Sequence, residues 1–274
     1  MMDAAVRIAP WLLPADGVYP NMPAADYHAA EAMSSGGARK ILQSPAHYRL
    51  MRDTPNDPTA AMEFGTAVHA GVLEPDRYLE LVAIGPNVGT RTKAWTEFVA
   101  AHPGVVCLTP DDAERAARCI AAVRAHPAAS RLLAGAQVEL SVFWHDGQYG
   151  VPCKARYDIR NRGGLADLKT TGNASVEAFA RTCVEYLYHV QAWHYWSGAE
   201  HALDASPEFF AFIIVEKDPP HAVAVRTLGR ASLMKGARLL DEALARYRDA
   251  LATGTWPAYA DTIESFELPR YALA

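Results

Sequence analysis

Apolar residues recur at helical spacing along the first half of the chain. Capping residues and prolines mark the ends of these segments: Thr109-Pro110 followed by two acids is a strong helix start, and Pro127 interrupts the same helix. The pattern predicts helices over about 35–43, 46–53, 60–74, 92–101 and 110–126, with a turn at 55–58.

The period changes to alternation at about residue 137. Up to about 171, apolar and polar residues alternate around turn signals at Asp146-Gly147 and Gly163-Gly164, which predicts three antiparallel strands. Beyond them the pattern predicts helices near 175–185 and 187–199, strands over 208–217 and 221–228, and a long helix over 230–253. This order predicts an α/β fold in which helices flank a central mixed β-sheet.

The chain divides into an N-terminal arm and a single domain. Residues 1–26 are rich in proline and alanine and predict an extended arm. Residues 27–274 predict one domain, with a helical N-terminal portion over 27–134 and a core over 135–260. At 274 residues the chain is long enough to bury a full hydrophobic core.

Composition excludes several classes of protein. The longest apolar run, 209–215, is far shorter than the roughly 20 residues of a membrane span, and the start lacks the basic segment of a signal peptide. We therefore expect a cytoplasmic protein with no membrane partner. The 4 cysteines are widely spaced without a CxxC pair, which argues against a zinc ribbon or a disulfide framework.

The candidate chemistry lies on the predicted hairpin 150–172. Asp167 and Lys169 are two apart in a strand and share a face, whereas Leu168 points to the opposite layer. Asp167 stands among apolar residues, where a charge is costly without a partner or a metal, and Asp158 lies one hairpin turn away. Two converging carboxylates beside an ammonium suit a divalent cation and metal-assisted phosphodiester cleavage.

Four further residues are candidates with structural alternatives. Glu139, on the preceding strand, is either a third ligand or a solvent-facing edge residue. His69 lies on a helix next to small residues that permit close backbone approach, although a lone helical histidine is more often structural. Gln191 and Tyr195 share a helix face and could hold a phosphate or a metal-bound water, although the aromatic segment around them could simply be core.

This set of residues resembles the RecB-type branch of the PD-(D/E)XK nuclease superfamily, and more closely the RecE (exonuclease VIII) nuclease domain. The similar stretches are MSSGGARKILQSPAHYRL, FGTAVHAGVLEPDRY, TRTKAWTEF, GVPCKARYDI and LADLKTT, within residues 18–260. The resemblance implies a restriction-endonuclease-like core and a RecE-like domain over 27–274. Tyr157 precedes Asp158 where the family pattern has proline, a common variation.

The resemblance also implies roles for the candidate residues. Asp158, Asp167 and the carbonyl of Leu168 would bind Mg²⁺ or Mn²⁺, with His69 at the metal or the phosphate. Glu139 would complete the metal shell, Lys169 would orient or deprotonate the attacking water, and Gln191 and Tyr195 would position the metal and the DNA backbone. From the local clustering of basic residues we expect Arg91, Lys93 and Arg162 to contact DNA phosphates. Some relatives hold an iron–sulfur cluster through four cysteines, but the cysteine spacing here does not match, so we predict none.

The activity that the resemblance implies is 5′-to-3′ exonuclease digestion of double-stranded DNA ends, leaving 3′ overhangs for recombination. The implied partners are DNA ends, a RecT-like single-strand annealing protein of phage recombination systems, and other copies of the chain in a ring. Two alternatives stay open: a RecB-like nuclease with single-strand or endonuclease activity, and a non-catalytic DNA-binding protein that retains the fold.

Overall fold

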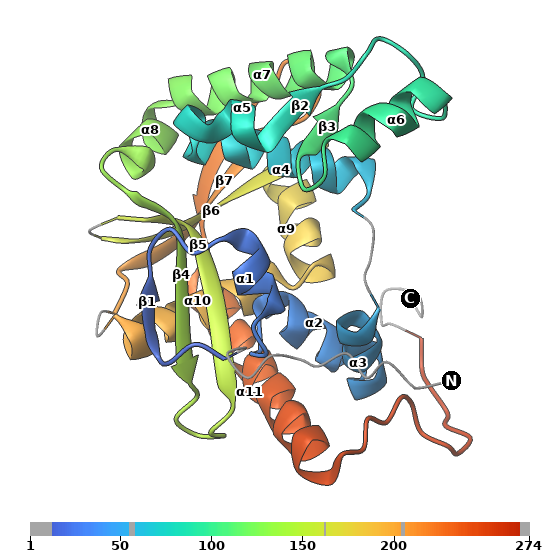
Figure 1. The fold of residues 1–274 in the computed structure, drawn as a ribbon. Coiled ribbons are helices and arrows are strands. Elements are labelled where there is room, and N and C mark those ends of the chain that lie inside the picture. The colour runs from blue at the N-terminus through green and yellow to red at the C-terminus, as the bar shows by residue number, and fades with distance from the viewer. Residues whose placement is uncertain (1–12, 55–57, 162, 204–205, 269–274) are drawn as a thin grey trace.

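A six-stranded mixed sheet forms the centre of the computed structural model, which describes residues 13–54, 58–161, 163–203 and 206–268 (Figure 1). The spatial order is β1-β4-β5-β6-β7-β8, and every neighbouring pair is antiparallel except β6-β7. The strands are β1 (Gly17–Tyr19), β4 (Gln137–His145), β5 (Pro152–Arg160), β6 (Gly164–Thr171), β7 (Phe209–Glu216) and β8 (Val223–Thr227). The predicted α/β fold with a mixed sheet flanked by helices is confirmed.

Helices cover both faces of this sheet, and most of the buried apolar residues belong to two large cores. The first core lies against α2 (Ser35–Gln43), α3 (Pro45–Asp53), α9 (Val176–Glu185), α10 (Tyr188–Ala202) and α11 (Arg230–Thr253). The second lies against α4 (Ala60–Leu73), α7 (Pro110–Ala125), α8 (Pro127–Leu133) and a small parallel pair, β2 (Val82–Ile84) and β3 (Val106–Leu108). Among the described residues, no helix has the length and apolar character needed to cross a membrane.

The long helices begin and end where the sequence signals predict. The side chains of Thr59 and Thr109 accept hydrogen bonds from the backbone of α4 and α7, and α11 ends at Gly254 in the left-handed conformation. The helix predicted over 92–101 is α6 (Lys93–Ala101). The short elements are missing from the prediction: α1 (Ala24–Ala29), η1 (Pro75–Arg77), α5 (Tyr78–Leu81), α8, β2 and β3. Three- to seven-residue elements carry too few residues to display a period.

The described part of the predicted extended arm contains regular structure. Gly17–Tyr19 forms strand β1 on the edge of the sheet against β4, and α1 begins at Ala24, before the predicted end of the arm. Residues 1–12 and the core of the predicted turn, 55–57, lie outside the described residues.

Helix α10 is held in place by an unusually close approach to α11. A Cβ atom added at Gly236 of α11 would lie 2.0 Å from the backbone oxygen of His189 on α10. Only glycine permits this contact, and it fixes the position of Gln191, two residues further along α10.

Candidate active site

The hairpin formed by β5 and β6 opens at its two aspartates. The antiparallel register pairs Arg160 with Leu165 and Ile159 with Ala166, so the next pair would be Asp158 with Asp167. Instead, the backbone N–H of Leu168 donates to Oδ2 of Asp158 at 2.8 Å. The carboxylate thus takes the place of a strand partner, and both acids lie at the fork between the strands.

Glu139 lies on β4 directly opposite Asp158. Val138 pairs with Ile159 and Leu140 with Tyr157, which leaves Glu139 and Asp158 facing each other across the ladder. Glu139 has a φ of 50°, in the left-handed region that non-glycine residues rarely adopt. Such strain is concentrated at functional sites, because the surrounding structure must stabilise it.

Both strands change their packing at this point. Leu140 and Tyr157 pack in the first core, whereas Val138 and Ile159, two residues away on the same strands, pack against the second. In an ideal strand, residues two apart would share a face. The distortion at Glu139 therefore lies at the boundary between the two cores, where the candidate site forms.

His69 reaches this site from α4, on the second-core face of the sheet. Its Nε2 donates to the carbonyl oxygen of Leu168 at 2.7 Å, because a carbonyl can only accept. Its Nδ1 lies 3.4 Å from Oδ2 of Asp158. One ligand atom each from His69, Glu139 and Asp158 lies within 4.8 Å of the others, so the structure brings these three predicted ligands together.

Asp167 forms a second group with two other predicted catalytic residues, Lys169 and Gln191. Its Oδ2 lies 2.6 Å from Nζ of Lys169, and its Oδ1 accepts a hydrogen bond from Nε2 of Gln191 at 2.6 Å. Asp167 is almost completely buried, with 1% of its side chain exposed, so the ammonium and the amide compensate for its desolvation. Asp167 is not among the three residues whose ligand atoms cluster within 4.8 Å.

The charges of these groups are strongly coupled. Burial and the negative charge of Asp167 raise the pKa of Asp158 to about 7, although His69 acts in the opposite direction. Burial alone would lower the pKa of Lys169, but Asp167 and Asp158 outweigh it, so the pKa of Lys169 is raised. Lys169 is therefore an ammonium at neutral pH in the metal-free protein.

Sequence reasoning missed Tyr188, which covers this ammonium. The Nζ atom of Lys169 lies 4.5 Å from the centroid of the Tyr188 ring, a cation–π contact. Tyr188 begins α10, three residues before Gln191. Tyr188 lies in the aromatic-rich segment that the sequence shows, but because that segment is generally apolar, the sequence does not indicate which ring faces the lysine.

Tyr195 lies mainly in the core rather than at the surface of the site. Its ring packs edge-on against those of Tyr157 and Phe210, at interplanar angles of 65° and 67°, and it is 7% exposed. Burial, Asp167 and Asp158 raise its pKa well above the usual range. The hydroxyl of Tyr195 is thus affected by the charges of both acids, and its ring is part of the hydrophobic core. A catalytic role for Tyr195 stays a prediction.

Two of the three predicted DNA-binding residues lie in the part of the chain that the structure describes. Arg91 and Lys93 are exposed at the start of α6, where Lys93 pairs with Glu97 at 3.4 Å. Arg162 lies outside the described residues. Contacts of these cations with DNA stay a prediction.

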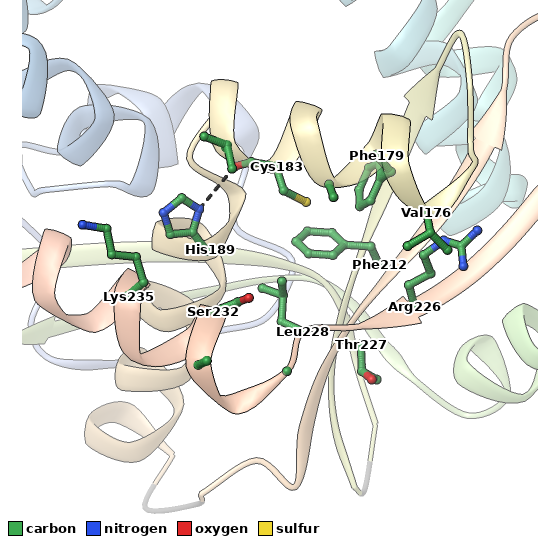
Figure 2. Close-up of a pocket in the computed structure, with 14 residues that line it drawn as sticks. Val176, Phe179, Cys183, His189, Phe212, Arg226, Thr227, Leu228, Ser232 and Lys235 are labelled. Carbon is green, nitrogen blue, oxygen red and sulfur yellow. Dashed lines mark hydrogen bonds between the residues drawn. The ribbon is translucent and has the colours of Figure 1, made fainter. Parts of the chain in front are cut away.

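A hollow of about 490 Å³ lies between α9 and the start of α11, and none of the predicted site residues lines it (Figure 2). Its floor contains Phe179 and Phe212, and on one side Nδ1 of His189 donates to the carbonyl of Cys183. Phe179 and Phe212 also contact the ring of Tyr188. The hollow is thus separated from Lys169 by a layer of aromatic rings.

Comparisons with known proteins bear on the family and the fold of the chain. The family model described as "PDDEXK-like domain of unknown function (DUF3799)" matches residues 34–269. No curated protein matches the chain. Among solved structures, the chain is similar to a protein of Eubacterium rectale described as a candidate exonuclease, with a TM-score of 0.62 and 12% identity, over 93% of this chain and 98% of the other.

Proposed function

Because the chain belongs to the PDDEXK-like family whose model it matches, we propose that it is a divalent-metal-dependent deoxyribonuclease that degrades double-stranded DNA from its ends. The family and the solved structure support a nuclease; the direction of digestion, from 5′ to 3′ with a remaining 3′ overhang, is the finer part of the proposal. It rests on the resemblance of the sequence to RecE-type nucleases.

The observation that carries the proposal is the pair formed by His69 and Asp158. Because Nε2 of His69 donates to Leu168, Nδ1 is the ring nitrogen left to bind a cation, and it lies only 3.4 Å from a carboxylate oxygen. Two such atoms repel each other unless a proton or a cation lies near both. With Glu139 in the same group, two carboxylates are available to Mg²⁺ or Mn²⁺, which prefer oxygen ligands; Mg²⁺ usually also keeps several of its waters.

The residues of the candidate site would have separate roles in cleavage. Asp158, Glu139, His69, Asp167 and the carbonyl of Leu168 would hold the ion, which polarises a phosphate oxygen and lowers the pKa of its water. The ammonium of Lys169 would orient the attacking water and stabilise charge on the phosphate. Its raised pKa favours this electrostatic role over that of a base in the metal-free protein.

Gln191 and Tyr195 would position the acids and the DNA backbone from α10. Gln191 already holds Asp167, which keeps one carboxylate oxygen in a fixed orientation. Arg91, Lys93 and Arg162 would contact phosphates, so that a protein of net charge −5 binds DNA through local basic residues. A ring of copies, a RecT-like annealing partner and a cytoplasmic location complete the proposal.

The test uses end-labelled linear, nicked and closed circular duplexes with Mg²⁺. We expect linear duplex to yield mononucleotides from the 5′-ended strand, closed circles to survive, and EDTA to stop the reaction. Efficient cleavage of closed circles or a preference for single strands would favour the RecB-like alternative. Binding without any cleavage in Mg²⁺ or Mn²⁺ would favour a non-catalytic DNA-binding protein.

A further inference from the structure

We propose that Arg156 is a positioning residue that holds Glu139 in its strained conformation and orients it toward His69 and Asp158. This inference rests on the proposed function, because it assigns Glu139 to a metal site. Arg156 lies on β5, two residues before Asp158, and was not among the residues expected to form the site.

Arg156 contacts only one of the two carboxylate oxygens of Glu139. Nε of Arg156 lies 2.5 Å from Oε2 of Glu139, with only 15% and 22% of the two side chains exposed. Oε1 is the other oxygen of the same carboxylate. An ion pair to one oxygen fixes the plane of the carboxylate and leaves the second available to the group of ligands.

Arg156 is itself fixed from two other directions. Its Nη1 donates to Oγ of Ser141 at 3.0 Å and to the carbonyl oxygen of Met22 at 2.8 Å. Ser141 is fully buried on β4, and Met22 lies just before α1. The guanidinium therefore cannot follow Glu139 to another position without losing both bonds, so the arginine is a rigid support.

The backbone of Glu139 explains why such a support is needed. A φ of 50° is unfavourable for a non-glycine residue, and it persists only where neighbouring contacts enforce it. One such contact is the ion pair with Arg156. Without it, Glu139 could relax toward ordinary strand geometry, which would rotate its side chain away from Asp158.

The direction in which replacing Arg156 changes divalent-ion affinity distinguishes a positioning role from a simple charge effect. A cation beside a metal site repels the metal, so charge alone predicts that removing Arg156 strengthens divalent-ion binding. Positioning predicts the opposite, because an unsupported Glu139 is a poorer ligand. Supporting residues behind metal ligands typically affect affinity by about 10–100-fold.

The experiment compares Arg156→Lys and Arg156→Gln with the wild type in Mn²⁺ titrations followed by electron paramagnetic resonance. Lysine keeps the charge and loses the planar fork, whereas glutamine loses the charge. Positioning predicts that both variants weaken Mn²⁺ binding by about 10-fold or more, with activity largely restored at saturating Mn²⁺. Arg160→Gln is the matched control, because Arg160 lies on the same strand but pairs with Gln137.

Unchanged affinity in Arg156→Lys, or tighter binding in Arg156→Gln, would overturn the inference. If a variant does not fold, as judged by circular dichroism, the other one decides the question. Glu139→Gln and Asp158→Asn distinguish a failure of the Arg156 inference from a failure of the proposed function. If both weaken Mn²⁺ binding while the Arg156 variants do not, the metal site stands and Arg156 does not position it; if neither does, the metal site itself is wrong.

Discussion

The carboxylate of Asp158 accepts a hydrogen bond from the backbone N–H of Leu168 at 2.8 Å, where the ladder between β5 and β6 would otherwise continue. This contact keeps the two strands apart without leaving a buried donor unsatisfied. It also fixes Asp158 to the residue whose carbonyl receives His69. The opening of the hairpin and the assembly of the candidate site therefore have the same cause.

The first prediction concerns the acids and the lysine. Asp158→Ala, Asp167→Ala and Lys169→Ala should each lower cleavage by at least about 10²–10³-fold. The aspartate variants should also weaken Mg²⁺ binding in calorimetry, whereas Lys169→Ala should retain the ion. Thr170→Ala, which alters the opposite face of β6, is the control. Normal Mg²⁺ affinity in Asp167→Ala would contradict its assignment as a ligand.

The second prediction concerns pH. Because burial and Asp167 raise the pKa of Asp158 to about 7, this carboxyl is largely protonated below that pH in the metal-free protein. A metal needs the ionised form, so binding should release a proton below pH 7 and affinity should fall as pH decreases. Calorimetry in buffers of different ionisation enthalpy measures the release. Asp158→Asn should abolish it, and an unchanged release would show that another group titrates.

The third prediction concerns DNA binding. Replacing Arg91 and Lys93 together by alanine should weaken binding to all sequences and reduce the slope of log K against log salt by about 1.8, since each phosphate contact contributes about 0.9. Fluorescence anisotropy with a labelled duplex measures the slope. Arg118→Ala on α7 is the control, because Arg118 is equally an exposed cation paired within its own helix. An unchanged slope in the double variant would place the DNA elsewhere.

The fourth prediction concerns the position of α10. Gly236→Ala would place a methyl group against the carbonyl of His189, so α10 must shift and carry Gln191 away from Asp167. We expect a loss of about 1–3 kcal/mol in the free energy of unfolding, measured by urea denaturation, together with reduced cleavage. Gly229→Ala is the matched control, because no atom lies within 4 Å of an added Cβ there. Equal stability of the two variants would contradict the proposed contact.

The sequence by itself determined the long elements and the central part of the chemistry. Helical spacing with cap residues located α4, α7 and α11, and alternation located β4, β5 and β6. The two-residue period of a strand placed Asp167 and Lys169 on one face, where they form an ion pair. These features depend on residues a few positions apart, which is the range over which periodicity carries information.

The tertiary structure alone decided which distant residues meet. His69 contacts Leu168 across 99 positions of the chain, and Gln191 contacts Asp167 across 24, because helices from both faces pack on one strand. It also placed Glu139 opposite Asp158, in a left-handed conformation and paired with Arg156, and the ring of Tyr195 in the core, while the roles of both residues stay predictions. Packing sets such contacts, and packing depends on the shape of the whole core rather than on any local pattern.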